Sequence, residues 1–115
     1  MDNKFHVSYE VAKLLKEKGY NEETISYYNN IGKLYLGNGH FNHNAYAICL
    51  SAPTKAEAID WLESKGIIVE AFYTSYHWFF SIIDFNVKQR IFADEYYLTR
   101  LEAEEAAIIK ALETL

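Results

Sequence analysis

Residues 67–85 read IIVEAFYTSYHWFFSIIDF, and this stretch decides the fold class. Ile67–Tyr73 and His77–Phe85 are rich in β-branched and aromatic residues, which favour strands. Thr74-Ser75-Tyr76 separates them as a short turn. In the second run both sets of alternate positions are apolar, which is typical of a strand at the centre of a sheet. The stretch therefore predicts an antiparallel hairpin whose second strand is central.

Helices are predicted on both sides of this hairpin. Thr54-Lys55-Ala56-Glu57 and Thr99-Arg100-Leu101-Glu102 both have the spacing of a capping box, in which Thr caps the helix and Glu folds back. Gly66 ends the first of these helices. The residues 90–97 predict a third, more polar strand near an edge of the sheet.

The first half of the chain predicts another helix and another hairpin. Ser8 is a suitable N-cap for a helix over residues 9–18. Strands are expected at 25–28 and 33–36, joined by a turn at 29–32, with a third strand at 45–50. Residues 37–44, rich in Gly and Asn, predict a mobile loop that folding does not require.

The predicted class is α+β, with element order α-ββ(β)-α-βββ-α. Short turns between consecutive strands favour a mostly antiparallel sheet, and the one-sided apolar stripes of the helices predict that all three pack on one face. Because no linker rich in Pro, Gly or Ser interrupts the chain, residues 1–115 are expected to form a single α+β domain.

Composition excludes several classes of protein. The 115 residues carry a net charge of −5, and residues 51–115 contribute all of it. Without a cluster of Lys and Arg, the chain is a poor candidate for binding duplex nucleic acid. Cys49 is the only cysteine, so an intramolecular disulfide is impossible. No apolar run approaches the roughly 20 residues of a membrane span, and no signal-peptide core is present, so we expect a cytoplasmic protein without a membrane partner.

His40 and His43 are the weak candidates for a metal site. Zinc needs three or four ligands, and Cys49 and His77 are the further candidates. Cys49 lies in an apolar run where a buried thiol is more typical. We therefore expect two solvated loop histidines, no metal, no cofactor and no catalytic residue.

The aromatic content predicts a binding surface. Ten Tyr, seven Phe and two Trp are more aromatic residues than one small core accommodates. The candidate binding face consists of Tyr73, Tyr76, Trp78, Tyr96 and Tyr97. Exposed Tyr and Trp favour protein association, so the expected partner is another protein or a second copy in a homodimer. A single-stranded nucleic-acid or regulatory DNA-binding module is the first alternative, although Lys33, Lys88 and Arg90 are few for holding phosphates. A metal protein or enzyme using the His40/His43 loop is the second.

Three segments resemble a group of short uncharacterised proteins encoded by phages and integrated mobile elements of Bacteroides-type gut bacteria. They are Val7–Gly19, Ser51–Leu62, and Trp78–Ile82 followed by Thr99–Ala107. The resemblance covers most of the chain and is weakest at residues 37–44. It implies an accessory protein of a mobile element in a bacterial cytoplasm, and it carries over no catalytic residue.

Overall fold

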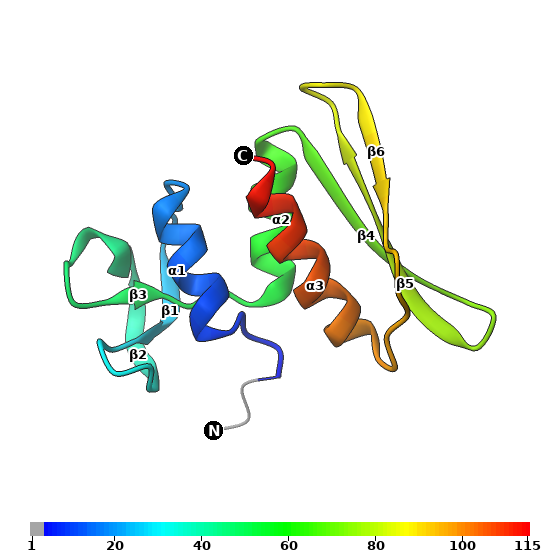
Figure 1. The fold of residues 1–115 in the computed structure, drawn as a ribbon. Coiled ribbons are helices and arrows are strands. Elements are labelled where there is room, and N and C mark those ends of the chain that lie inside the picture. Colours follow the sequence, from blue (N-terminus) through cyan, green and yellow to red (C-terminus); the bar gives the residue numbers. More distant parts are fainter. Residues whose placement is uncertain (1–3) are drawn as a thin grey trace. The chain divides into compact units, whose positions relative to one another are not determined.

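The computed structural model describes residues 4–115 and confirms the α+β class and the predicted order of elements. The chain divides into two compact units, the first ending at Ala56 and the second running from Glu57 to Leu115. Each contains its own three-stranded antiparallel sheet, visible as two separate groups of arrows in Figure 1. The strands therefore form two small sheets, where the sequence predicted one. Within residues 4–115, no helix is both long enough and apolar enough to cross a membrane.

The first unit combines a helix with the sheet β2-β1-β3. Its elements are α1 (Tyr9–Glu17), β1 (Thr24–Tyr28), β2 (Leu34–Phe41) and β3 (Leu50–Ser51). The start of α1 is as predicted, because the Ser8 hydroxyl accepts a hydrogen bond from the amide of Val11 at 3.2 Å. Gly19 follows the helix at φ +92°, a conformation that glycine adopts without a steric penalty.

The predicted mobile loop at 37–44 is wrong, because Gly37–Phe41 continue β2. A Cβ atom on Gly37 would lie 2.7 Å from the carbonyl oxygen of Ile25, so glycine permits a close approach of two backbones at an irregularity in the β1–β2 register. The glycine that suggested a turn therefore belongs to a strand. The predicted third strand is present, but its bounds of 45–50 are wrong, since His43–Ala45 form a short 3-10 helix, η1, and β3 has only the two residues Leu50–Ser51.

The segment between β2 and β3 is held by side chains. Asn44 donates from Nδ2 to the carbonyl of Tyr20 at 2.8 Å and accepts the amide of Ser51 at 2.8 Å. The ammonium group of Lys16 donates to the carbonyl oxygens of Tyr46 and Cys49, at 2.8 and 3.0 Å. These bonds tie the segment to α1 and to the sheet.

The second unit is a meander of strands with a helix on one face. Its strands are β4 (Ile67–Thr74), β5 (His77–Asp84) and β6 (Gln89–Phe92), in the order β4-β5-β6, so β5 is central as predicted. The strand β6 is shorter than the predicted 90–97. Tyr97 instead pairs with Trp78 in an isolated bridge, with N···O distances of 2.9 and 2.8 Å.

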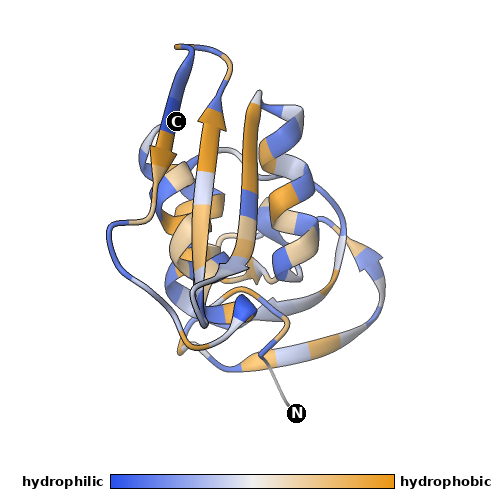
Figure 2. Ribbon diagram, turned by 90° about the vertical axis from the view of Figure 1, so that its right-hand side faces the viewer, coloured by the Kyte–Doolittle hydropathy of each residue, from blue (hydrophilic) through white to orange (hydrophobic). Residues whose placement is uncertain are grey.

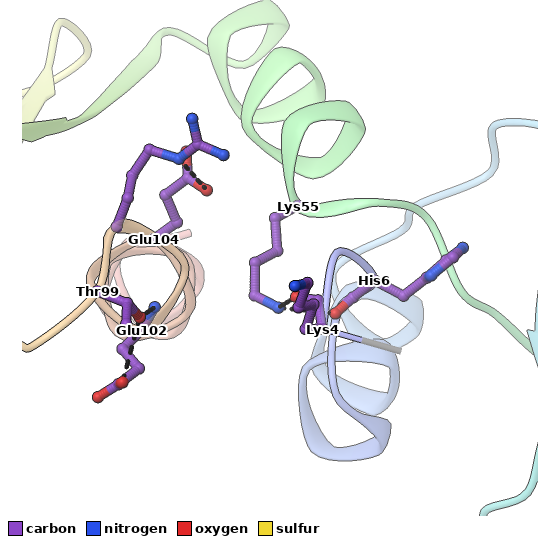
Figure 3. Close-up of polar contacts among 7 residues, drawn as sticks. Lys4, His6, Lys55, Thr99, Glu102 and Glu104 are labelled. Atoms are coloured by element: carbon purple, nitrogen blue, oxygen red, sulfur yellow. Dashed lines mark hydrogen bonds and ion pairs between the residues drawn. The ribbon is translucent and has the colours of Figure 1, made fainter. Parts of the chain in front are cut away.

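The remaining helices begin where the two Thr residues predict. The helix α2 (Lys55–Ser64) starts directly after Thr54, and α3 (Arg100–Glu113) starts after Thr99. Figure 3 shows the α3 cap, in which the Thr99 hydroxyl accepts the amide of Glu102 and donates to its carboxylate, both at 3.1 Å. The same figure shows Lys55 donating to the carbonyl oxygens of Lys4 and His6.

The core of the second unit lies between α3 and the sheet. The strand residues Ile67 and Ile82 are fully buried, as are Ile108 and Leu112 of α3. Ile67, Val69, Phe80 and Ile82 are on the same face of the hairpin, by the alternation of strand residues. The helix α3 therefore covers this face of the strands and does not cover the opposite face.

Replacing Ile108 with Ala should lower the free energy of unfolding by about 2–5 kcal/mol, because it removes buried methyl groups and leaves a cavity. Ile31→Ala is the matched control, since Ile31 is 81% exposed and its loss should change stability by less than about 0.5 kcal/mol. Urea denaturation measures both. Equal losses in the two variants would place Ile108 outside the core.

The β4–β5 turn stores backbone strain. Thr74 pairs with His77, so Ser75 and Tyr76 alone form the loop, at φ 53° and 68°. Two-residue hairpin loops with both angles positive are favoured by Asn-Gly, because residues with a Cβ atom pay about 1–2 kcal/mol in this region. Tyr76 is nevertheless there, and it is 89% exposed.

The double substitution Ser75→Asn and Tyr76→Gly should therefore raise the free energy of unfolding by about 1 kcal/mol. Gly19→Ala is a control that should lower the free energy of unfolding, by about 1 kcal/mol. A Cβ atom on residue 19 would meet no atom within 4 Å, so this loss reports the positive φ alone. Chemical denaturation of the natural chain, the double variant and Gly19→Ala measures these changes in the free energy of unfolding. A double variant less stable than the natural chain would show that the turn carries no such strain.

Candidate interaction surface

The face of the β4-β5-β6 sheet turned away from α3 is the candidate site, and we call it the open face. Strand alternation and register place ten residues on it: Ile68, Glu70, Phe72, Thr74, His77, Phe79, Ser81, Ile83, Arg90 and Phe92. Figure 2 looks onto the sheet from this side. The strands β4 and β5 carry mostly apolar colours, and no helix of the second unit lies in front of them.

Two apolar pairs lie along the open face, separated by the row that holds Glu70 and Ser81, and we call them the apolar strip. Ile68 is paired with Ile83, and Phe72 with Phe79, whose rings stack at 6.1 Å. These four residues are half-buried by one another, whereas Phe92 on β6 is 59% exposed. An antiparallel sheet that faces water on one side normally alternates apolar and polar residues. This sheet has five apolar residues among the ten of its open face, which a solvated face does not require.

Two opposite charges lie on the two outer strands of the open face, on either side of β5. Glu70 on β4, Ser81 on β5 and Phe92 on β6 lie in one row across the sheet. Arg90 is one row away, and its guanidinium group lies 5.1 Å from the centre of the Phe92 ring. This cation–π contact brings the positive charge toward the row that contains Glu70. The open face therefore has one negative edge, one positive edge and an apolar centre.

The open face, polar and apolar residues together, has an area comparable with the largest surface patches of monomeric proteins. Three strands about 4.8 Å apart and up to eight residues long, at about 3.3 Å per residue, span on the order of 300 Å² in projection. Apolar patches of a few hundred Å² on a monomer commonly mark interaction sites. Phe85 and Val87, in the turn after β5, are 63% and 61% exposed and extend the apolar area.

The five predicted binding residues do not share one face. Tyr73 and Trp78 are paired across the strands on the α3 side, with ring centres 5.5 Å apart, and Tyr97 bridges to Trp78. Tyr96 instead lies 4.1 Å from the ring of His77, an open-face residue. Tyr76 is at the tip of the hairpin. The five gather around one end of the hairpin, on both sides of it.

The apolar residues of the open face are not among the five predicted binding residues. Ile68, Phe72, Phe79 and Ile83 have the alternating spacing of one strand face on each side of the predicted turn. That signal was present, because both faces of the second strand were recognised as apolar. It was interpreted as evidence for a buried central strand, and exposed Tyr residues were preferred as a binding surface because they are amphipathic.

A groove beside Tyr97 is a second surface of the same unit. It has a volume of about 480 Å³ and lies between the strands and α3, with Phe80, Ile91 and Ile109 among its apolar lining residues. Asp94, Lys110 and Glu113 contribute charges to its lining. The Tyr97 hydroxyl donates to the carboxylate of Glu95 at 3.4 Å. Partial burial raises the pKa of Tyr97 above 10.0, and the negative charges of Glu95 and Asp94 raise it further.

The His40/His43 pair does not converge on a common point. His40 is an exposed residue of β2, whereas His43 is only 8% exposed, so the expectation of two solvated histidines is wrong for His43. The Nε2 atom of His43 lies 3.1 Å from the carbonyl oxygen of Thr24, and the ring stacks on Tyr27 at 4.6 Å. Sequence spacing gave no sign of these contacts. Among residues 4–115, no three His, Cys, Asp or Glu side chains are grouped closely enough to hold a metal ion.

Aromatic rings on the first unit's sheet are arranged in a stacked row. Tyr27 stacks with Tyr35 at 5.5 Å and with His43 at 4.6 Å, with interplanar angles of 19° and 27°. The ammonium group of Lys33 lies 5.3 Å from the centre of the Tyr35 ring. Single-stranded nucleic acids bind by stacking bases on free ring faces. Because these rings stack on each other, the row offers few free faces for a base.

A comparison of the chain with protein-family models, curated protein sequences and solved structures found no match.

The raised pKa of Tyr97 predicts a difference in stability at high pH. A raised pKa in the folded state contributes stability that is present below the ordinary pKa of about 10 and is lost as the pH rises through the folded value. Tyr97→Phe removes this contribution, so the natural chain should lose more stability than the variant between about pH 8 and pH 11. Urea denaturation across that range, with Tyr76→Phe as the control, measures the difference. Parallel curves for the natural chain and Tyr97→Phe would contradict the assignment.

Proposed function

We propose that this chain is a non-enzymatic protein-binding module that uses the open face of the β4-β5-β6 sheet. The observation that carries the proposal is the presence of two apolar pairs, Ile68 with Ile83 and Phe72 with Phe79, on the face opposite α3. Covering such a strip removes apolar surface from water, at about 25 cal/mol per Å². A protein surface can cover these residues through apolar contacts alone.

Charge supports a protein partner over a nucleic acid. The residues 57–115 hold eleven acidic residues against five Lys and Arg, whereas the open face itself carries only Glu70 and Arg90 as permanent charges. Phosphate binding needs an excess of positive charge, which this unit lacks. A near-neutral apolar face rimmed by single charges is the composition found at the centre of protein interfaces.

The sequence resemblance supplies the biological setting of the proposal. It implies an accessory protein of a phage or mobile element in a bacterial cytoplasm. Small proteins that act by binding need no catalytic residues, and none is assigned here. We therefore propose an accessory protein of a phage or mobile element that binds its partner through the open face.

A photo-crosslinking amino acid at position 79 tests the proposal in bacterial cells that express the chain. Phe79 lies on the central strand and points onto the open face, so the expected product is a crosslink that nuclease leaves intact and protease destroys. The same amino acid at Ile31, which is 81% exposed, is the control and should give little product. Crosslinking at position 79 no stronger than at position 31, or a nuclease-sensitive product, would overturn the proposal.

A further inference from the structure

We infer that the partner of the open face is a second copy of this chain, related by a two-fold axis that runs parallel to β5. This inference rests on the proposed function, because it names the occupant of the same face. It is carried by the placement of Glu70 and Arg90 on opposite edge strands of one face, on either side of the central strand β5. An interface between two identical copies must be self-complementary, and this face meets that condition.

The axis follows from the register of the sheet. When two such sheets pack face to face, about 10 Å apart, a two-fold axis along β5 places β4 of one copy opposite β6 of the other. The row of Glu70 then faces the row of Phe92 in the second copy. The guanidinium group of Arg90 lies over Phe92, so it meets the carboxylate of Glu70 from the other copy. The symmetry generates this ion pair twice.

The alternative axis, perpendicular to the strands, is unfavourable. It places β4 opposite β4 and β6 opposite β6, so Glu70 faces its own counterpart and Arg90 faces its own. Like charges juxtaposed in an interface oppose association. Within residues 4–115, the side chain of Glu70 forms no ion pair or hydrogen bond, so its carboxylate is available for a partner charge.

Apolar packing at the centre agrees with the same axis. The residues of β5 meet their own counterparts, so Phe79 faces Phe79 and Ile83 faces Ile83. Between them the small residue Ser81, which is only 3% exposed, faces Ser81 of the other copy. The acidic helix α3 lies on the opposite face of the sheet, so its charges stay away from the contact.

The area sets the strength of this dimer. A face on the order of 300 Å² in projection is below the roughly 800 Å² of accessible surface that each partner buries in a stable interface. Phe85 and Val87 add to it, but the contact stays at the small end of the range. The expected dimer is therefore weak and concentration-dependent, with a Kd in the micromolar range or above.

Charge exchange between two variants is the decisive experiment. Glu70→Arg places Arg opposite Arg90, and Arg90→Glu places Glu opposite Glu70, so each variant alone should dimerise at least about tenfold more weakly than the natural chain. An equimolar mixture of the two pairs every Arg with a Glu, and it should associate as strongly as the natural chain. Sedimentation velocity up to about 1 mM protein measures all three samples.

Two controls match the changes in charge. Glu22→Arg and Arg100→Glu alter exposed residues outside the open face by the same amounts, and they should leave dimerisation unchanged. Recovery in the mixture also shows that both variants are folded. A natural chain that dimerises while the mixture stays monomeric contradicts the proposed axis. A natural chain that is monomeric at about 1 mM overturns the second copy as partner. In that case, a crosslink from position 79 to a different protein would still uphold the proposed function.

Discussion

A β-sheet has two faces, and in this chain both faces of the β4–β5 hairpin are apolar. The helix α3 packs on β4 and β5 and buries Ile67, Ile82 and Ile108 completely. The opposite face keeps Ile68, Phe72, Phe79 and Ile83, which bury one another only in part. The proposed function depends on this difference in burial between the two faces of the hairpin. A surface that covers the open face removes its apolar side chains from water, and this is favourable.

The parts of the fold that local chemistry specifies could be predicted from the sequence. Ser8 and Thr99 mark helix starts because their hydroxyl groups satisfy free backbone amides within a few residues. The centre of the second sheet was predictable because the apolar residues of 77–85 occupy both sets of alternate positions. Gly37 was misinterpreted because its role is a close approach to Ile25, a contact between two strands that spacing along the chain does not reveal.

The candidate site was predicted less well than the fold, for two physical reasons. Exposed aromatic residues were grouped by composition, yet strand alternation separates Tyr73 and Trp78 from Tyr96. His43 was expected in solvent, yet a hydrogen bond and a stacked ring bury it. Both differences concern which way a side chain points, and this depends on register. The open face could have been found by applying the alternation of residues 67–83 strictly to both strands.

The charge distribution around the open face and the strained β4–β5 turn are both consistent with a binding role for this face. The acidic residues of α3 lie behind the sheet, so the open face is close to neutral and flanked by one charge of each sign. At its end, the β4–β5 turn holds Tyr76 in a left-handed conformation where glycine is preferred. Strained conformations persist where the surrounding structure fixes them, and they are common at functional sites. Tyr76 and Tyr96 extend aromatic surface around that end of the strip.

Solvent accessibility of isoleucine methyl groups, measured by NMR with a soluble paramagnetic chelate, tests the central claim most directly. In dilute protein, the methyl signals of Ile68 and Ile83 should be broadened, although less than those of Ile31, while Ile82, which is fully buried, should not respond. On concentration, the signals of Ile68 and Ile83 should become protected and that of Ile31 should not. Protection of Ile68 and Ile83 already in the dilute protein would contradict the account, because the chain would then cover its own open face.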